Sequence, residues 1–188
     1  MDWPGWLLSR TFAWPCLSII RSSVVDDLEG GMSYLDRVIL RIFFPENGDS
    51  LERGILVNLP SGEPLMIEAK FVGWLADLLG HKEITQWKGT GGNMCCLECA
   101  NIHKHARGDD DRRGYGPYCS NMQNFDRLSS DDIYDICGEL AEQYLVLGVT
   151  AFEALETTKG FTYVPNGLLL DPSLRLIYRP HQHTIGDW

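Results

Sequence analysis

The sequence predicts a mixed α/β protein. Helical periodicity of apolar residues appears near residue 40 and again after residue 130, and two short β-like runs joined by a Pro/Gly turn lie between them. A chain of 188 residues with 44% apolar and 22% charged residues is long enough to form one domain with a real core.

The first half alternates helical and strand-like patterns. Residues 32–44 carry one apolar stripe, which predicts a helix that ends before Pro45. The runs at 54–59 and 65–69 predict a hairpin, because a Pro/Gly turn separates them. Residues 70–80 return to helical spacing and predict a helix with Gly80 as its C-cap. The apolar positions are Leu35, Val38, Ile39, Ile42 and Phe43 in the first helix, and Phe71, Trp74, Leu75 and Leu78 in the second.

The second half is predicted to be helical and then irregular. Residues 131–147 have helical spacing, and a capping-box pattern at Thr150-Ala-Phe-Glu153 predicts a further helix from there to Lys159. The polar stretch 103–117 is predicted to be a loop, and Pro165-Asn-Gly167 a turn before a short buried run.

Composition limits the functional classes. The net charge of -10 argues against broad nucleic-acid binding by this chain alone, because such binding needs Lys and Arg to neutralise phosphates. Six cysteines are too few for a disulfide-stapled secreted module, so we expect a reducing, intracellular compartment. Residues 1–20 are apolar but interrupted by Pro4, Arg10 and Pro15, so we expect a poorly ordered lead-in and no membrane partner. The folded region is then 21–188.

The most specific chemical signal is Cys96-x-x-Cys99, which follows the glycine-rich turn 88–92. This spacing lets two thiolates bind one tetrahedral ion, so it predicts half of a zinc site in an insertion spanning 88–119. Two alternatives stay open: a redox pair, although the usual strand–helix frame is missing, and ordinary buried thiols. The candidates for the remaining zinc ligands are His103, His105, Cys119, His181 and His183.

The second candidate is Asp77, an acid in the predicted 70–80 helix. A carboxylate among apolar residues is a possible ligand for a hard cation such as Mg²⁺, and two-metal phosphoryl transfer needs several carboxylates. The alternative is that Asp77 faces solvent at the edge of the helix.

Several motifs occur in an order that resembles a known family. They are Gly30-Gly-Met-Ser33 with Phe43-Phe44, the segment 71–77, Lys88-Gly-Thr-Gly-Gly leading to Cys96-x-x-Cys99, and Asp187-Trp188. This series is similar to the central part of the CACTA (En/Spm-like) class of DDE transposases, from about Arg21 to the last residue.

The resemblance implies a partial RNase H-like fold with a zinc-binding insertion. In that fold, acids on a mixed sheet and a neighbouring helix hold two Mg²⁺ ions for phosphoryl transfer on DNA. By position, Asp77 resembles the second acid of the triad, and Cys96 and Cys99 resemble a zinc half-site. Asp187 resembles the start of an Asp-x-Met-His segment. The implied partner of the ancestral full-length protein is DNA, and the implied location is the nucleus.

The chain also departs from the family pattern. No clear strand with an aspartate precedes Asp77, since Asp26 and Asp27 precede a predicted helix, and the final acid of the triad is expected beyond Trp188. One carboxylate cannot hold two metals, so we expect an incomplete catalytic triad and no recombinase activity. The rival hypothesis is a non-catalytic, intracellular zinc-binding module that binds a protein partner through its acidic surface and N-terminal aromatic residues.

Overall fold

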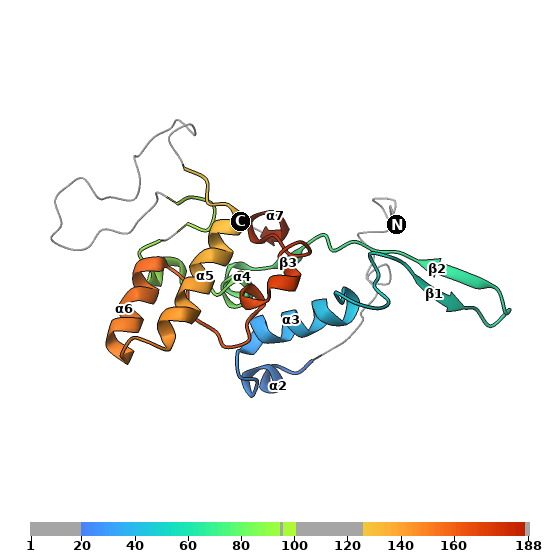
Figure 1. Cartoon of the computed structure of the whole chain (residues 1–188), viewed down its shortest axis with the longest axis horizontal. Coiled ribbons are helices and arrows are strands. Elements are labelled where there is room, and N and C mark those ends of the chain that lie inside the picture. The colour runs from blue at the N-terminus through green and yellow to red at the C-terminus, as the bar shows by residue number, and fades with distance from the viewer. Residues whose placement is uncertain (1–19, 95, 101–125, 187–188) are drawn as a thin grey trace.

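A computed structural model describes residues 20–94, 96–100 and 126–186, and these form a mixed α/β protein, as predicted. Two separate two-stranded sheets accompany the helices in this part of the chain (Figure 1). None of the described helices has the length and apolarity that crossing a membrane requires. The elements in chain order are α2 (Ser22–Asp26), α3 (Gly31–Phe43), β1 (Ile55–Asn58), β2 (Pro64–Ile67), β3 (Trp74–Ala76), α4 (Leu78–Thr85), the 3₁₀ turn η2 (Gly89–Gly91), α5 (Ser130–Tyr144), α6 (Val149–Lys159), the 3₁₀ turns η4 (Leu168–Leu170) and η5 (Pro172–Leu174), α7 (Pro180–His183) and β4 (Thr184–Gly186).

Helix α3 confirms the first predicted helix, but it buries a different face from the apolar stripe. Ser33 and Asp36 are buried, whereas Ile42 of the stripe is 67% exposed. Ser33 can be buried because its hydroxyl oxygen accepts hydrogen bonds from Gln86 Nε2 (2.7 Å) and from the backbone N–H of Leu168 (3.0 Å). These partners come from distant parts of the chain, so local periodicity does not report them.

Strands β1 and β2 form the predicted hairpin, which extends away from the helices (Figure 1). Their antiparallel register runs from Ile55 opposite Ile67 to Asn58 opposite Pro64. Successive strand residues point to opposite faces, so apolar side chains are exposed on both faces of the hairpin. Leu56 is 62% exposed on one face, and Leu65 is 46% exposed on the other.

The predicted helix over residues 70–80 is wrong. Residues 74–76 form β3, which pairs in parallel with β4 from Trp74 opposite Thr184 to Ala76 opposite Gly186. Gly73, with a φ of 153°, precedes the strand, and Asp77 begins α4 by accepting a hydrogen bond from Gly80 N–H (2.8 Å). Gly80, the predicted C-cap, therefore lies in the first turn of α4. A contact 110 residues away in sequence overrides the local helical pattern here.

Helices α5 and α6 confirm the two helices predicted after residue 130, and they pack against each other. A capping box starts α5: the Ser129 hydroxyl accepts from Asp132 N–H (3.1 Å), and the Asp132 carboxylate accepts from Ser129 N–H (2.8 Å). The capping box predicted at residue 150 is wrong, because α6 begins one residue earlier after Gly148 and has no side-chain cap. The helix ends at Lys159, as predicted, and Gly160 caps it in a left-handed conformation (φ 77°).

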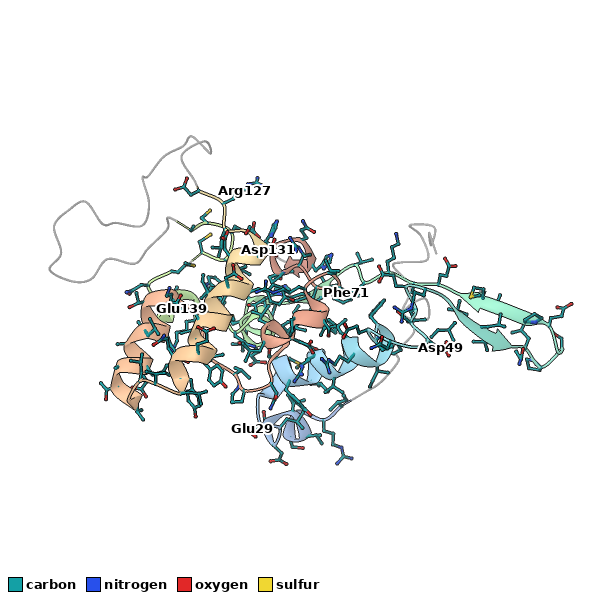
Figure 2. The ribbon with its side chains drawn as sticks, in the orientation of Figure 1. Glu29, Asp49, Phe71, Arg127, Asp131 and Glu139 are labelled. Carbon is teal, nitrogen blue, oxygen red and sulfur yellow. The ribbon has the colours of Figure 1, made fainter. Side chains whose placement is uncertain are left out.

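Charged side chains on α5 tie it to its neighbours. Asp131 accepts two hydrogen bonds from Arg179, each of 3.0 Å, just before α7. Further along α5, Glu139 forms an ion pair with Lys159 at the end of α6 (2.6 Å). Asp131 and Glu139 are both labelled in Figure 2. These exposed pairs align the C-terminal segment and α6 along α5, although each one contributes little free energy.

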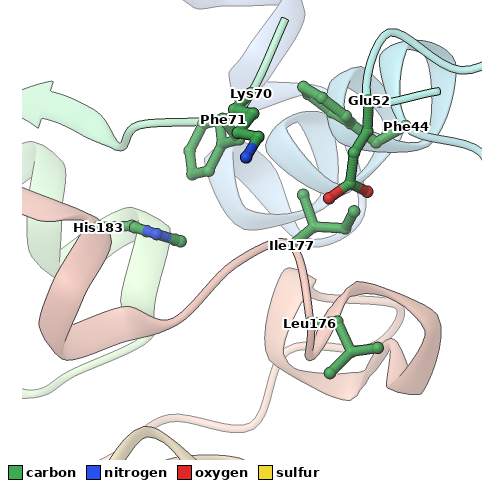
Figure 3. A pocket seen from close by; sticks show the side chains of 7 residues that line it. All are labelled: Phe44, Glu52, Lys70, Phe71, Leu176, Ile177 and His183. Atoms are coloured by element: carbon green, nitrogen blue, oxygen red, sulfur yellow. The ribbon is translucent and has the colours of Figure 1, made fainter. Parts of the chain in front are cut away.

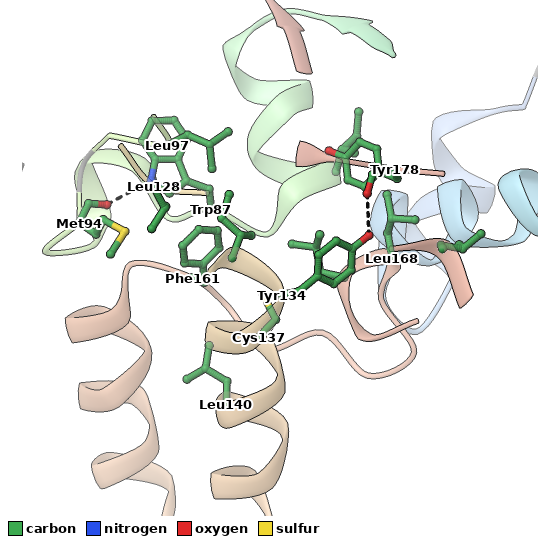
Figure 4. Packing of buried hydrophobic residues seen from close by; sticks show 14 of the residues in the cluster. Trp87, Met94, Leu97, Leu128, Tyr134, Cys137, Leu140, Phe161, Leu168 and Tyr178 are labelled. Atoms are coloured by element: carbon green, nitrogen blue, oxygen red, sulfur yellow. Dashed lines mark hydrogen bonds between the residues drawn. The ribbon is translucent and has the colours of Figure 1, made fainter. Parts of the chain in front are cut away.

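The core is formed by α5, α6 and the C-terminal segment (Figure 4), together with Leu40 of α3 and Ile84 of α4. Two buried polar groups in it have partners: Trp87 Nε1 donates to the carbonyl of Met94 (3.1 Å), and Tyr134 Oη donates to the carbonyl of Tyr178 (3.0 Å). The first bond holds the start of the cysteine segment against the core. The least exposed apolar members, each at most 2% exposed, are Leu40, Ile133, Tyr134, Cys137, Leu140, Phe161, Leu168, Leu169, Leu174 and Tyr178.

Candidate functional site

The glycine-rich turn that precedes the cysteines packs on the end of α6. Lys88 N–H donates to the carbonyl of Gly160 (2.9 Å), and Asn93 N–H donates to the carbonyl of Thr157 (2.7 Å). A Cβ at Gly92 would lie 2.7 Å from the Cα of Gly160, so this approach requires glycine. The turn thus sets the direction in which the chain leaves toward the cysteines.

The two thiols predicted to act together do lie together. Cys96 and Cys99 are both free and half-buried, and Leu97 between them is 4% exposed and anchors the turn. Burial, a hydrogen bond with Cys96 and the charge of Cys96, in that order of importance, together raise the pKa of Cys99 to about 11. Without a cation, the Cys99 thiol therefore stays protonated at neutral pH. A metal ion would bind it with release of protons.

A short antiparallel contact holds the cysteine pair in place. Ala100 N–H donates to the carbonyl of Asp126 (2.8 Å), and Leu128 N–H donates to the carbonyl of Glu98 (3.0 Å). The contact joins 98–100 to 126–128, with Cys99 opposite Arg127, which is labelled in Figure 2. The residues that flank 101–125, Ala100 and Asp126, thus meet next to the Cys99 position. The predicted ligands His103, His105 and Cys119 belong to that segment and lie outside the described residues.

The two C-terminal histidines contact different parts of the fold. His181 Nδ1 is 2.7 Å from the hydroxyl oxygen of Ser130, the first residue of α5. His183 Nδ1 accepts from Arg179 N–H (3.0 Å), and its ring packs edge-on against Phe71, with centroids 5.3 Å apart. Burial lowers the pKa of His183, and the charges of Arg179 and His181 lower it further, so this imidazole is neutral at pH 7.

His183 also lines a small cavity of about 170 Å³ next to the base of the hairpin (Figure 3). Phe71 and Ile177 supply apolar wall, and Lys70 and Glu52 are its charged lining residues. In the part of the chain that the structure describes, no three His, Cys, Asp or Glu side chains are close enough to hold a metal ion. Neither C-terminal histidine therefore completes a site with Cys96 and Cys99 here.

Asp77 stands at the end of a strand, not within a helix. Its side chain is exposed, and its Oδ1 caps α4 through Gly80 N–H. Because β3 and β4 run parallel and in register, they end level with each other, at Ala76 and Gly186. The next residue in sequence is an aspartate in both cases: Asp77 after β3, and Asp187 after β4, which lies outside the described residues.

Sequence reasoning missed two acids that matter to the fold. Asp36 is 3% exposed on α3, and Asp171 is fully buried between η4 and η5. Asp171 binds Arg37 (2.7 Å) and Arg41 (3.0 Å) of α3. The four-residue spacing of the two arginines is a sequence signal for one shared helical face, but it does not identify their partner.

Comparison of the chain with models of protein families, with curated proteins and with solved structures finds no match.

Proposed function

We propose that this chain is a transposase-derived protein whose ancestral reaction is metal-dependent phosphoryl transfer on DNA. The observation that carries the proposal is the in-register parallel pair β3–β4, in which Ala76 lies opposite Gly186. An aspartate follows each strand in the sequence, Asp77 and Asp187. Parallel strands in register present their carboxyl ends at one edge, which is where open α/β sheets bind ligands.

The donor chemistry at this edge fits Mg²⁺. Hard divalent cations prefer carboxylate oxygens, and Mg²⁺ commonly binds through one or two carboxylates together with water and phosphate oxygens. When bound, the ion would stabilise negative charge on a phosphodiester. Two carboxylates are fewer than a complete two-metal site uses, so we expect metal binding without DNA cleavage by this chain.

Cys96 and Cys99 are proposed as half of a structural zinc site in the insertion of this RNase H-like region. The contact between the thiols supports this, as does their place where 98–100 meets 126–128. The remaining ligands are proposed to come from His103, His105 or Cys119. Zinc at this position would stabilise the contact between 98–100 and 126–128.

A second candidate function is a non-catalytic zinc module that binds a protein partner. The observation that favours it is the projecting β1–β2 hairpin, which exposes apolar side chains on both faces, including Leu56 and Leu65. Contiguous exposed apolar surface commonly marks an interaction site. Both candidate functions include zinc binding. The two are therefore distinguished by whether Asp77 and Asp187, which follow β3 and β4 in the sequence, bind a metal ion.

Metal titration of the full chain tests the first candidate. We expect Mn²⁺ or Mg²⁺ to raise the melting temperature of the wild type, and Asp77→Asn and Asp187→Asn each to abolish that rise. Asn caps a helix about as well as Asp, so Asp77→Asn keeps the start of α4 while it removes the charge. A metal-induced rise that is unchanged in both variants would refute the transposase proposal and leave the module. DNA cleavage by the wild type, lost in Asp77→Asn, would refute only the expected inactivity.

Elemental analysis tests the zinc site separately. We expect one zinc per chain, lost in Cys96→Ser and Cys99→Ser and retained in Cys137→Ala, whose thiol is buried in the core. The loss of zinc should lower the melting temperature, because binding free energy at a structural site is folding free energy. Zinc-free wild-type protein whose stability is unaffected by Cys96→Ser would exclude this site.

A further inference from the structure

The cavity at the base of the hairpin has an apolar interior and a charged rim (Figure 3). Phe44 is only 8% exposed, and Phe71 and Ile177 are half-buried, so these side chains form the inner wall. Glu52 and Lys70 are exposed lining residues and bring one negative and one positive charge to the opening. A ligand that fits this distribution has an apolar part, which enters the cavity, and charged groups, which stay at the rim.

Backbone hydrogen bonds place the two charged residues on the rim. Leu51 N–H donates to the carbonyl of Phe43 at the end of α3 (2.9 Å), and Ala69 N–H donates to the carbonyl of Leu51 (2.9 Å). Because Glu52 follows Leu51 and Lys70 follows Ala69, the two sides of the hairpin base carry opposite charges beside the same cavity. Neither charged group forms an ion pair or a hydrogen bond with another described residue, so both are available to a ligand.

Phe71 and His183 complete the lining with a fixed ring and a fixed donor. The Phe71 ring packs edge-on against Phe44 and His183, with centroid distances of 6.4 Å and 5.3 Å. Nδ1 of His183 accepts from Arg179 N–H, so the hydrogen of the neutral imidazole is on Nε2. Within the described part of the chain, nothing accepts a hydrogen bond from this Nε2–H. His183 can therefore donate to an acceptor on a ligand.

The charges at the rim select the class of ligand. An anion is attracted by Lys70 but repelled by Glu52, and the reverse holds for a cation. A zwitterion gains from both charges. The cavity volume of about 170 Å³ is close to the roughly 150 Å³ of an engineered apolar cavity that holds benzene. The apolar part of the ligand should therefore be no larger than about a benzene ring.

We propose that this cavity binds a free α-amino acid with a medium-sized apolar side chain. The ligand carboxylate lies beside Lys70 and His183, and its ammonium group lies beside Glu52. The apolar side chain packs against Phe71 and Ile177 inside the cavity. This inference goes beyond the proposed function, because the site uses neither the acids that follow β3 and β4 nor the cysteine pair.

Titration of the full chain with L-leucine, followed by methyl NMR, tests the site. We expect the Ile177 methyl resonances to shift saturably at millimolar L-leucine, whereas those of Ile133, which is 0% exposed in the core and does not line the cavity, stay unchanged. 4-Methylpentanoate lacks the ammonium group and isoamylamine lacks the carboxylate, so each should bind about fivefold more weakly or worse. No saturable shift of Ile177 with L-leucine, or equal affinities for the three compounds, would overturn the proposal.

Two rim variants test the assigned contacts, and both alter exposed side chains. Glu52→Gln should weaken L-leucine about fivefold and strengthen 4-methylpentanoate, because it removes the repulsion of the carboxylate. Lys70→Gln should weaken L-leucine to a similar extent and strengthen isoamylamine for the corresponding reason. Glu63→Gln is the matched control, because it removes an exposed acid just before β2 that does not line the cavity, and it should keep the wild-type affinities. Identical affinities in all three variants would refute recognition by the rim charges.

Discussion

Asp171 holds α3 against the C-terminal segment, and replacing it with Asn gives a defined change in stability. Burial acts to raise the pKa of Asp171, but hydrogen bonds from Arg41, Arg37 and Ser173 outweigh it and lower the pKa from 3.8 to about 2. Each pKa unit corresponds to about 1.4 kcal/mol, so the ionised carboxylate stabilises the folded state by about 2.5 kcal/mol at neutral pH. Arg41 is half-exposed and stays hydrated without its partner, so the loss in Asp171→Asn should be about 3 kcal/mol, at the lower end of values for broken buried pairs.

The assay is urea unfolding of the wild type and Asp171→Asn, followed by far-UV circular dichroism at pH 7 and pH 3. Because folding lowers the pKa of Asp171, its contribution is present above about pH 4 and is lost as the pH falls through about 2. The difference between the two proteins should therefore shrink to about half at pH 3. Asp135→Asn, which removes an exposed pair with Arg175 of 2.8 Å, should cost less than about 1 kcal/mol. Equal losses in both variants, or a difference that does not depend on pH, would refute the reasoning.

Two further predictions concern packing and backbone conformation, and the same urea assay checks both. Leu140→Ala opens a cavity at a fully buried position of α5 and should cost about 2–5 kcal/mol, whereas Leu145→Ala, at an 85% exposed position, should change stability by less than about 0.5 kcal/mol. A small loss in Leu140→Ala would contradict the assigned core. Gly160→Ala should cost about 2 kcal/mol or more, because φ is 77° and the new Cβ would lie 2.8 Å from the carbonyl oxygen of Met94. Gly138→Ala, with open space around its Cβ, should instead stabilise α5 by about 0.5–1 kcal/mol, and the same sign in both variants would contradict the proposed cause.

Local patterns predicted the elements that depend on local contacts. Residues 130–144 repeat an apolar side every three or four positions and begin with a reciprocal cap, so α5 is readable from the sequence. Residues 74–76 carry the same kind of spacing but form β3, because their partner strand lies 110 residues later. The buried face of α3 escaped prediction for a related reason. Ser33 is buried through hydrogen bonds from Gln86 and Leu168, which periodicity within one helix cannot reveal.

In the candidate site, too, features that depend on local contacts were predictable and features that depend on distant contacts were not. The closeness of Cys96 and Cys99 was predictable, since two residues three positions apart in a turn anchored by Leu97 have little room to separate. The pairing of 98–100 with 126–128 was not predictable, because 25 intervening residues carry no strand signal that identifies the partner. The level ends of β3 and β4 are not predictable either, because the helical spacing of residues 70–80 predicts a helix where β3 forms.

The long sequence separation of β3 and β4 also orders events during synthesis. Trp74 leaves the ribosome 110 residues before Thr184, and at about 5–20 residues per second this interval lasts roughly 5–20 s. During that time the apolar strand β3 has no partner, and closing so long a loop is slow compared with forming the α5–α6 helix pair. The strand edge that ends at Asp77 is therefore among the last parts of the protein to form. Until then, Trp74 and Leu75 are accessible to chaperones and to other nascent chains.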